Sequence, residues 1–412
     1  MWTTTRTTAE MPRLFERGGD LISFAGGLPD LDVLPLEEIS GQLSRLVRLG
    51  GKITFQYSTP HVPKALVPAI ADLMDREGAH VPAEELIPTG GSQAGLMAVA
   101  LGLASPGETV LCQTPAYPGA TAAFRTAGLR LRGVPEDADG MDPQGLRETV
   151  AALRAEGRAV RLLYCNPTHQ NPTGRTLSQE RRTALIAVCQ ELDLLIVEDN
   201  PYGLLSFDGT CVTSMKALAP DHVVYLGTFS KVFAPGLRCG WIAAPAHLTQ
   251  NLRSTTEVMT LSPSALAQSA LATFYARNGW TDTIDGYRRG YRERCTQMAD
   301  ALDAELGADG PWEWRRPDGG FYIWLRHREG ADTGRYAEPA ARHGVSFVPG
   351  SHFSVDGEHA DGLRLCFSHV PRRRMDEGVS RLAAALREDV SGRDLAGDHV
   401  TRDAALREGA AR

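Results

Sequence analysis

The sequence lacks several features that would assign it to a membrane or nucleic-acid protein. No apolar run approaches the roughly 20 residues of a membrane span, and the first residues carry no apolar secretion-signal core. Positive charge is not in excess, because 43 Lys and Arg stand against 50 Asp and Glu, for a net charge of −7. We therefore expect a cytoplasmic protein whose partners are small molecules, with no nucleic acid and no membrane.

The spacing of cysteine and histidine gives no sign of a metal site. The seven cysteines are scattered without a Cys-x-x-Cys pair, and the eleven histidines show no metal-ligand spacing. We expect buried free thiols and no metal. His61 and His169 lie in turn-rich segments and are candidates to line a cleft, although a solvated or packed histidine is the ordinary state.

Lysine is scarce: 39 of the 43 basic residues are arginine, and the lysines are Lys52, Lys64, Lys216 and Lys231. Lys231 follows an apolar, β-branched run that predicts a buried strand, beside Thr228 and Ser230 and before Arg238. A lysine amine can condense with a carbonyl to a Schiff base, while hydroxyls and a guanidinium hold phosphate oxygens. This stretch therefore suggests a site for a phosphorylated aldehyde. An exposed loop with ordinary surface cations is the alternative, and codon bias can also make lysine rare.

The strand and helix pattern predicts an α/β protein with a mostly parallel sheet. Apolar strands alternate with helical stretches, and the predicted strands are 109–113, 129–134, 160–165, 193–198, 223–227 and 239–244. In such sheets ligands bind beyond the carboxyl ends of the strands. The polar residues that follow these strands, and that we expect to share one edge, are Tyr117, Asn171, Asp199, Tyr202 and Lys231.

Three glycine-rich or aromatic segments precede these strands. Gly26 and Gly27 end a short apolar run, where the backbone turns sharply or approaches a ligand, and residues 36–49 predict an amphipathic helix. Tyr57 lies in a loop. A glycine pair then leads into a helix whose first turn carries Ser92, a ready anion site, although Ser92 can also simply cap its own helix.

The pattern changes after about residue 275 and predicts a second, smaller α+β unit. A helical stretch at 264–306 leads to predicted strands near 321–325, 345–350 and 363–368 and to a closing helix at 371–388. Arg364 alternates with apolar neighbours, so it is expected to face solvent or, less often, to bind a carboxylate. We divide the chain into a segment joining the small domain (1–45), a large domain (46–275), a small domain (276–388) and a charged tail (389–412).

These segments together resemble the fold type I, pyridoxal-phosphate-dependent aminotransferases of class I/II. The likeness is greatest to the 2-aminoadipate and kynurenine aminotransferases and to the C-terminal domain of MocR-type regulators. It covers roughly residues 20–388. It is specific, because six phrases occur in family order at family-like separations: Phe-Ala-Gly-Gly-Leu-Pro, Gly-Ser-Gln, Gln-Asn-Pro-Thr-Gly, Asp-Asn-Pro-Tyr, Thr-Phe-Ser-Lys and Ala-Pro-Gly-Leu-Arg. The resemblance implies a large domain with a mostly parallel, seven-stranded-type sheet and a smaller α+β domain.

The resemblance also implies roles for the candidate residues. Lys231 would form the internal aldimine and act as general base and acid. Asp199 would pair with the pyridine nitrogen, so that the ring can accept electrons from the substrate Cα. The other implied cofactor ligands are Asn171 and Tyr202 at the ring hydroxyl, Tyr117 on the ring face, and Ser92, Gln93, Thr228, Ser230 and Arg238 at the phosphate.

For the substrate, the resemblance implies an α-amino acid and a 2-oxo acid that react in turn by a ping-pong mechanism. Arg364 would bind the α-carboxylate, helped by Asn171 and the Gly26–Gly27 loop. Tyr57 would reach the phosphate of a neighbouring subunit, which implies a homodimer with shared active sites.

The sequence departs from the family pattern after Tyr57, where Ser58, Val62 and Leu66-Val67 replace a Gly, Gly, Leu-Arg pattern. Gln113 also replaces a common Glu, and His169 stands where an apolar or aromatic residue is frequent. Arg13 or Arg17 could replace the family's N-terminal arginine. These segments shape the substrate site, so elimination, cyclisation or deamination of a specialised amino acid stays open. Asp30 and Asp32 would allow a cationic substrate side chain. An effector-sensing domain is a further alternative, but the chain begins too close to the enzyme-like region to hold a DNA-binding module.

Overall fold

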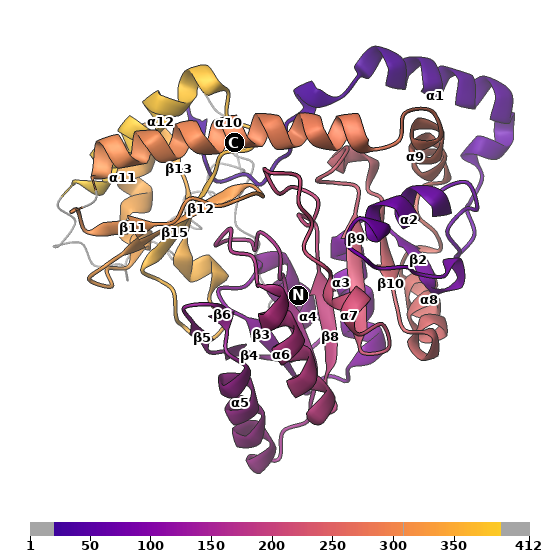
Figure 1. The fold of residues 1–412 in the computed structure, drawn as a ribbon, viewed down its shortest axis with the longest axis horizontal. Helices are drawn as coiled ribbons and strands as arrows, with labels where there is room; N and C mark the ends of the chain where they lie inside the picture. Colours follow the sequence, from indigo (N-terminus) through magenta and orange to yellow (C-terminus); the bar gives the residue numbers. More distant parts are fainter. Residues whose placement is uncertain (1–19, 308, 389–412) are drawn as a thin grey trace, which may run out of the picture.

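The computed structural model describes residues 20–307 and 309–388, and its centre is one seven-stranded sheet (Figure 1). The strand order is β2 (Leu86–Thr89), β10 (Gly240–Ala243), β9 (Val223–Thr228), β8 (Leu195–Asp199), β7 (Val160–Cys165), β3 (Thr109–Gln113) and β4 (Arg130–Val134). Only β10 runs antiparallel to its neighbours within this sheet. The predicted strands are thus confirmed, with ends that differ by at most two residues.

Helices cover both faces of this sheet, which explains why its strands are apolar on both sides. One face carries α3 (Ser92–Leu103), α4 (Pro118–Thr126) and α8 (Ala246–Thr260). The other carries α5 (Pro143–Ala155), α6 (Gln179–Glu191) and the short α7 (Met215–Leu218). Two apolar layers therefore hold the sheet rigid, while its carboxyl edge stays available for polar side chains.

A second sheet is built from the C-terminal part of the chain. Its order is β11 (Trp312–Trp314), β12 (Tyr322–His327), β15 (Gly362–Cys366) and β14 (Val348–Pro349), all antiparallel. Near the chain start, β1 (Ile22–Ser23) pairs with β13 (Val345–Ser346), so the segment before α1 (Leu36–Gly50) is held by the C-terminal part. α11 (Ala337–Arg342) and α12 (Arg372–Leu386) complete this unit.

The helical stretch predicted at 264–306 is two helices, which corrects the prediction of one. α9 (Ala265–Asn278) ends at Gly279, whose φ of 62° lies in the left-handed region, and α10 (Thr281–Leu306) starts after the buried Trp280. Glycine adopts this backbone without strain and so ends a helix. In Figure 1, α10 crosses the molecule from the side of α9 to that of α12.

Shorter elements connect these units. They are α2 (Val67–Asp75), the β5–β6 pair (Glu136–Asp137, Gly140–Met141), and the 3₁₀ turns Leu31–Val33, Gly51–Phe55, Ala83–Glu85, Pro235–Leu237, Thr333–Tyr336 and Gly350–Phe353. No helix within the described residues combines the length and apolar character needed to cross a bilayer. The predicted tail (389–412), Arg13 and Arg17 lie outside the described residues. The division into domains stays a prediction.

Candidate active site

Lys231 lies just beyond β9, and its amine makes one hydrogen bond within the described residues. Nζ donates a hydrogen bond to the carbonyl oxygen of Gly27 at 2.7 Å, which joins the large sheet to the N-terminal segment. Burial lowers the pKa of the amine to about 8, and the nearby guanidinium groups of Arg364 and Arg238 act in the same direction, against the carboxylate of Asp199. Its amine is therefore easier to deprotonate than that of an exposed lysine.

Asp199 ends β8 and leaves one carboxylate oxygen without a partner. The hydroxyl of Tyr164, on the neighbouring β7, donates to Oδ2 at 3.0 Å, whereas the buried Oδ1 receives no hydrogen bond from the described residues. Burial raises the pKa of Asp199 to about 7, although Tyr164 and Lys231 act to lower it. A buried, unpaired carboxylate oxygen is costly unless a ligand supplies a donor or a positive charge.

The start of α3 and the turn after β9 form a group of anion-binding donors. Gly91 is the N-cap of α3 with a φ of 92°, and Ser92 is the first helical residue, so the alternative that Ser92 caps its own helix does not hold. Arg238 donates to the carbonyl of Gly90 at 3.1 Å and lies so close that a Cβ on Gly91 would be 2.8 Å from its Nη2. A guanidinium beside a helix N-terminus is favourable only when an anion lies between them.

Two hydroxyls belong to the same group. The Thr228 hydroxyl donates to the Ser230 hydroxyl at 2.9 Å, and the Ser230 backbone N–H donates to Thr228 Oγ1 at 3.1 Å. Both residues are buried. This donor-rich turn matches the needs of a phosphate group.

Tyr117 and Gln93 form an aromatic and amide pair above the edge of the sheet. Tyr117 is the N-cap of α4, its hydroxyl donates to Gln93 Oε1 at 3.4 Å, and Gln93 Nε2 donates to the Gly119 carbonyl at 2.8 Å. A Cβ on Gly119 would be 2.5 Å from the Tyr117 ring, so glycine allows the ring to lie close to the backbone. Burial raises the pKa of Tyr117 to about 12, which keeps the phenol neutral.

Arg364 is buried on β15, at 2% exposure, and so the expectation that it faces solvent is wrong. Nη1 donates to Asn171 Oδ1 at 2.8 Å and Nη2 donates to the Ala25 carbonyl, while Nε has no partner among the described residues. The reason for burial is tertiary: the guanidinium lies over the ring of Tyr322, 4.4 Å from its centroid, and 5.1 Å from that of Phe353. The arginine thus keeps donor capacity for a bound carboxylate.

Two predicted residues do not join this group in the single chain. Tyr57 is 77% exposed, unlike the buried side chains of the site. Asp30 is engaged elsewhere, because its Oδ2 pairs with Arg294 at 2.7 Å and its Oδ1 accepts the Asp32 backbone N–H. The carboxylate of Asp30 is therefore already paired and gives no support to a cationic substrate side chain.

The histidines are also explained without a functional role. His61 is exposed. His169 is buried, with its ring nitrogens 3.0 Å from the Ser206 hydroxyl and 3.1 Å from the Thr176 hydroxyl, and burial lowers its pKa to about 4. It is therefore a packed, neutral histidine. No group of three or more His, Cys, Asp or Glu in the described part of the chain is placed to hold a metal ion.

The sequence reasoning missed Tyr164, Asn166 and Tyr322. Asn166 donates from Nδ2 to the Asp199 carbonyl at 2.6 Å and accepts the Asn171 backbone N–H, so it holds the ends of two strands. The hydroxyl of Tyr322 lies 3.0 Å from that of Tyr202. Tyr164 interrupts an apolar strand and Asn166 follows its end, and both patterns were visible signals; the position of Tyr322 was not.

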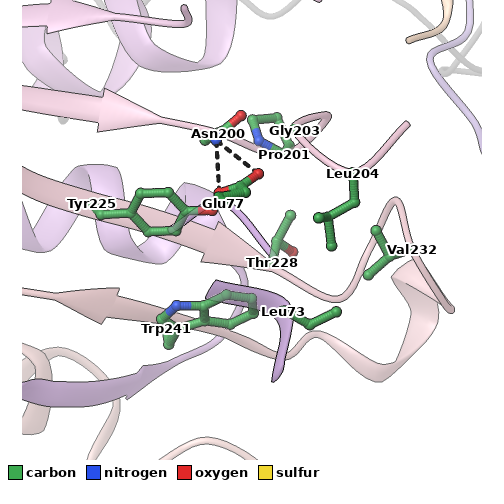
Figure 2. Close-up of a pocket in the computed structure, with 10 residues that line it drawn as sticks. All are labelled: Leu73, Glu77, Asn200, Pro201, Gly203, Leu204, Tyr225, Thr228, Val232 and Trp241. Carbon is green, nitrogen blue, oxygen red and sulfur yellow. Dashed lines mark hydrogen bonds between the residues drawn. The ribbon is translucent and has the colours of Figure 1, made fainter. Parts of the chain in front are cut away.

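A narrow pocket lies at the ends of β8 and β9 (Figure 2). Its lining includes Thr228 from the anion-binding turn and the buried Glu77. Both carboxylate oxygens of Glu77 accept from Asn200 Nδ2, at 3.1 and 3.0 Å, and Oε2 also accepts the Tyr225 hydroxyl at 2.8 Å. Glu77 in this pocket therefore anchors Asn200, the residue that follows Asp199. The pocket is part of the packing around that segment and not an open substrate site.

The donor set fits pyridoxal phosphate on three independent grounds. The unpartnered Oδ1 of Asp199 can receive a protonated ring nitrogen. The turn of Thr228 and Ser230, with Arg238 beside the start of α3, provides for a phosphate. Lys231 supplies a buried amine that can react with an aldehyde.

Known proteins are similar to this chain in sequence and in fold. The model of the family described as aminotransferase class I and II matches residues 20–382. An aromatic-amino-acid aminotransferase of Thermococcus litoralis is 34% identical over 385 residues, covering 92% of this chain and 91% of its own length. The crystal structure of a multiple substrate aminotransferase from Thermococcus profundus superposes with a TM-score of 0.84 at 33% identity, covering 91% of this chain and 93% of its own.

A further structure carries a cofactor adduct. The α-aminoadipate aminotransferase LysN of Thermus thermophilus, complexed with N-(5'-phosphopyridoxyl)-L-leucine, has a TM-score of 0.82 at 33% identity and covers 89% of this chain and 92% of its own.

Proposed function

The chain belongs to the class I and II aminotransferases, and on that premise we propose how its own residues carry the reaction. It is a pyridoxal-phosphate-dependent enzyme that transfers an amino group between an amino acid and a 2-oxo acid. One observation carries the proposal: the Lys231 amine is hydrogen-bonded to the Gly27 carbonyl, and the charges of both Asp199 and Arg364 act on its pKa.

The cofactor is held at three points in this proposal. Asp199 Oδ1 would pair with the ring nitrogen, Tyr117 would contact the ring, and Asn171 and Tyr202 would bind the ring hydroxyl. Ser92, Gln93, Thr228, Ser230 and Arg238 would hold the phosphate. When bound, pyridoxal phosphate supplies an electron sink for the bonding pair released at the substrate Cα.

The protein residues orient the substrate and move its proton. Arg364 binds the α-carboxylate beside Asn171 and the Gly26–Gly27 loop, and this fixes the Cα–H bond with respect to Lys231. The amine Nζ of Lys231, with its lowered pKa, would take the proton from the substrate Cα and hold it for the later protonation step. Opposite a protonated ring nitrogen, Asp199 would keep its negative charge.

A homodimer with shared sites is part of the proposal. The segment with Ile53, Phe55 and Tyr57 is held beside the end of α8 by the Ser58 backbone N–H, which donates to the Ser262 hydroxyl at 3.2 Å. Val258 and Leu261, at the end of α8, are also exposed. Apolar side chains from both segments are therefore left uncovered. A patch of this kind is favourable when a second copy covers it, and Tyr57 would then reach the phosphate of the other subunit.

The proposal includes the finer points of location and substrate. A cytoplasmic location is supported by seven free cysteines, which fit a reducing compartment, and cell fractionation tests it. The domain limits at residues 45, 275 and 388 are proposed with it, and limited proteolysis checks them.

The donor is an α-amino acid; aromatic amino acids and 2-aminoadipate are the first to test, because the relatives are named for them.

An absorbance titration tests the function. Purified protein loaded with pyridoxal phosphate is mixed with glutamate, alanine, 2-aminoadipate or an aromatic amino acid. We expect the visible cofactor band to fall as the amine form of the cofactor accumulates and a 2-oxo acid appears in equal amount, and Lys231→Ala to show no turnover. Release of ammonia without the amine form would contradict transamination and favour the elimination or deamination alternatives.

A mixing experiment tests the shared site. Tyr57→Phe and Lys231→Ala damage different parts of the proposed composite site, so a mixed dimer would contain one undamaged site. Partial recovery of activity on mixing supports the homodimer; no recovery from a demonstrated mixed dimer, or a monomer in light scattering, contradicts it.

A further inference from the structure

Tyr322 brings the small sheet into contact with the candidate site. It begins β12, is 1% exposed, and pairs in register with Cys366, two residues from Arg364 on β15. Its hydroxyl lies 3.0 Å from that of Tyr202, although the two residues are 120 positions apart in the sequence. The two rings meet edge to face, with centroids 5.8 Å apart. This contact is made entirely between buried side chains, so its geometry is firmly held.

The same side chain contacts two other parts of the site. The ring of Tyr322 lies under the guanidinium of Arg364, at 4.4 Å from its centroid, a cation–π arrangement that orients the plane of the arginine. The hydroxyl faces Gly27 so closely that a Cβ on Gly27 would be 2.3 Å from it. The carbonyl of Gly27 in turn accepts the hydrogen bond from Lys231.

We propose that Tyr322 is a positioning residue of the active site, whose hydroxyl fixes the donor direction of Tyr202 and the approach of the Gly27 loop while its ring orients Arg364. This inference rests on the proposed function, because it assigns Tyr202 to the ring hydroxyl of the cofactor.

The hydrogen bonds that the two phenols can make set the expected effect of Tyr322 on Tyr202. A phenol has one O–H donor and can accept through its oxygen lone pairs. If Tyr322 donates its proton to Tyr202, then Tyr202 keeps its own proton for the ring oxygen of the cofactor. Polarisation along this chain of two hydroxyls strengthens the second bond and stabilises the ring oxygen as an anion.

Tyr322→Phe removes this hydroxyl and keeps the ring over Arg364. Without the Tyr322 hydroxyl, Tyr202 would donate a weaker hydrogen bond to the ring oxygen of the cofactor, and the anionic form of that oxygen would be less stable. The titrating proton of the bound cofactor would then be released only at a higher pH. We expect the pH midpoint of the visible cofactor band to rise by about 0.5 units, with little change in the KM for the amino acid. The matched control is Tyr336→Phe, a buried tyrosine of the small sheet region that packs on Trp312, which should leave the midpoint unchanged.

A double-variant cycle separates a specific effect from a general loss of structure. Tyr202→Phe alone should raise the midpoint by about 1 unit. If Tyr322 acts through Tyr202, then adding Tyr322→Phe to Tyr202→Phe should shift the midpoint no further. Additive shifts would overturn the proposed coupling.

Gly27 provides a second measurement that does not depend on Tyr202. Gly27→Ala places its Cβ against the Tyr322 hydroxyl, and we expect weaker cofactor binding by about tenfold. In the Tyr322→Phe background the nearest atom becomes the ring carbon Cζ at 3.4 Å, which is ordinary contact. The same Gly27→Ala change should then weaken binding by less than about threefold. An equal loss in both backgrounds would show that the hydroxyl does not set this approach.

The wild-type protein distinguishes failure of this proposal from failure of the proposed function. If wild type forms no visible band with added pyridoxal phosphate, the proposed function itself is wrong. If wild type forms the band and Tyr322→Phe leaves its midpoint unchanged, the function stands and the role of Tyr322 is overturned.

Discussion

Two consecutive residues at the end of β8 face opposite sides of the sheet and have opposite surroundings. Glu198 points towards α6 and α7, where its oxygens accept the backbone N–H groups of Met215 and Lys216 at 3.0 and 2.8 Å, with Arg182 at 3.8 Å. Asp199 points to the other face and leaves Oδ1 unpaired among the described residues. The first carboxylate is satisfied by the protein, whereas the second keeps an oxygen that can still accept a hydrogen bond.

Two buried arginines repeat this contrast. Arg182 is 0% exposed and donates to three carbonyl oxygens, of Leu177, Thr213 and Pro167, and to the Thr168 hydroxyl. Arg364 leaves Nε without a partner among the described residues and lies between two aromatic rings. A buried charge costs free energy unless it is paired. The difference teaches that Arg182 and Glu198 stabilise the fold, while Arg364 and Asp199 keep capacity for ligands.

The acid pair gives the largest expected effect. Asp199→Asn removes the charge opposite the ring nitrogen, and we expect kcat/KM to fall by on the order of 10³-fold. The free energy of unfolding should change by less than about 1 kcal/mol, because asparagine still accepts from Tyr164. Steady-state kinetics and urea unfolding check this.

The neighbouring position is the matched control. Glu198→Gln leaves a backbone N–H without an acceptor and Arg182 without its counter-charge, so we expect a loss of about 3 kcal/mol in stability. Activity per folded molecule should stay within a few-fold of wild type. If Glu198→Gln abolishes activity in fully folded protein, the contrast between the two faces is wrong.

The arginine pair should show a smaller difference in the same directions. Arg364→Lys keeps the charge but loses the planar, two-donor geometry, and we expect the KM for the amino acid to rise by roughly 10- to 100-fold. Arg182→Lys should leave KM unchanged and lower stability by about 2 kcal/mol, because a lysine cannot reach all of its acceptors. Both KM and the free energy of unfolding are measured in both variants. Equal increases in KM would show that the two arginines do not differ in this way.

The remaining prediction concerns the pH dependence of stability rather than activity, at Glu77, a buried acid whose carboxylate oxygens both have partners. Burial raises its pKa to about 8, with the charge of Glu198 acting in the same direction and with Tyr225, Arg182 and Asn200 opposing it. Above the ordinary carboxyl pKa the folded protein holds a proton that the unfolded chain has released. Stability therefore falls as pH rises from about 4.5 to about 8, by up to about 1.4 kcal/mol per pH unit.

Glu77→Gln removes this titration, so we expect a flatter pH dependence of the melting temperature between about pH 5 and pH 8. Glu84→Gln, at an exposed glutamate nearby, serves as the matched control and should keep the wild-type slope. A wild-type slope in Glu77→Gln would show that another group carries the proton.

The sequence by itself determined the strands, the order of the motifs and the edge of the sheet where their polar residues gather. Lys231, Asp199 and Asn171 each follow an apolar run, and such runs are local signals of buried strands. The ends of parallel strands meet at one edge, so the strand pattern alone is enough to place residues together that lie far apart in the chain.

Only the tertiary structure decided how each side chain is satisfied. Nothing local to Arg364 says that a ring from β12 covers it, and alternation along β15 predicted solvent instead. Likewise the contacts between Tyr202 and Tyr322 and between Glu77 and Asn200 join residues 120 and 123 positions apart. Such contacts depend on how separate elements pack. A pattern with a period of two or 3.6 residues records which face is buried, but not what lies against it.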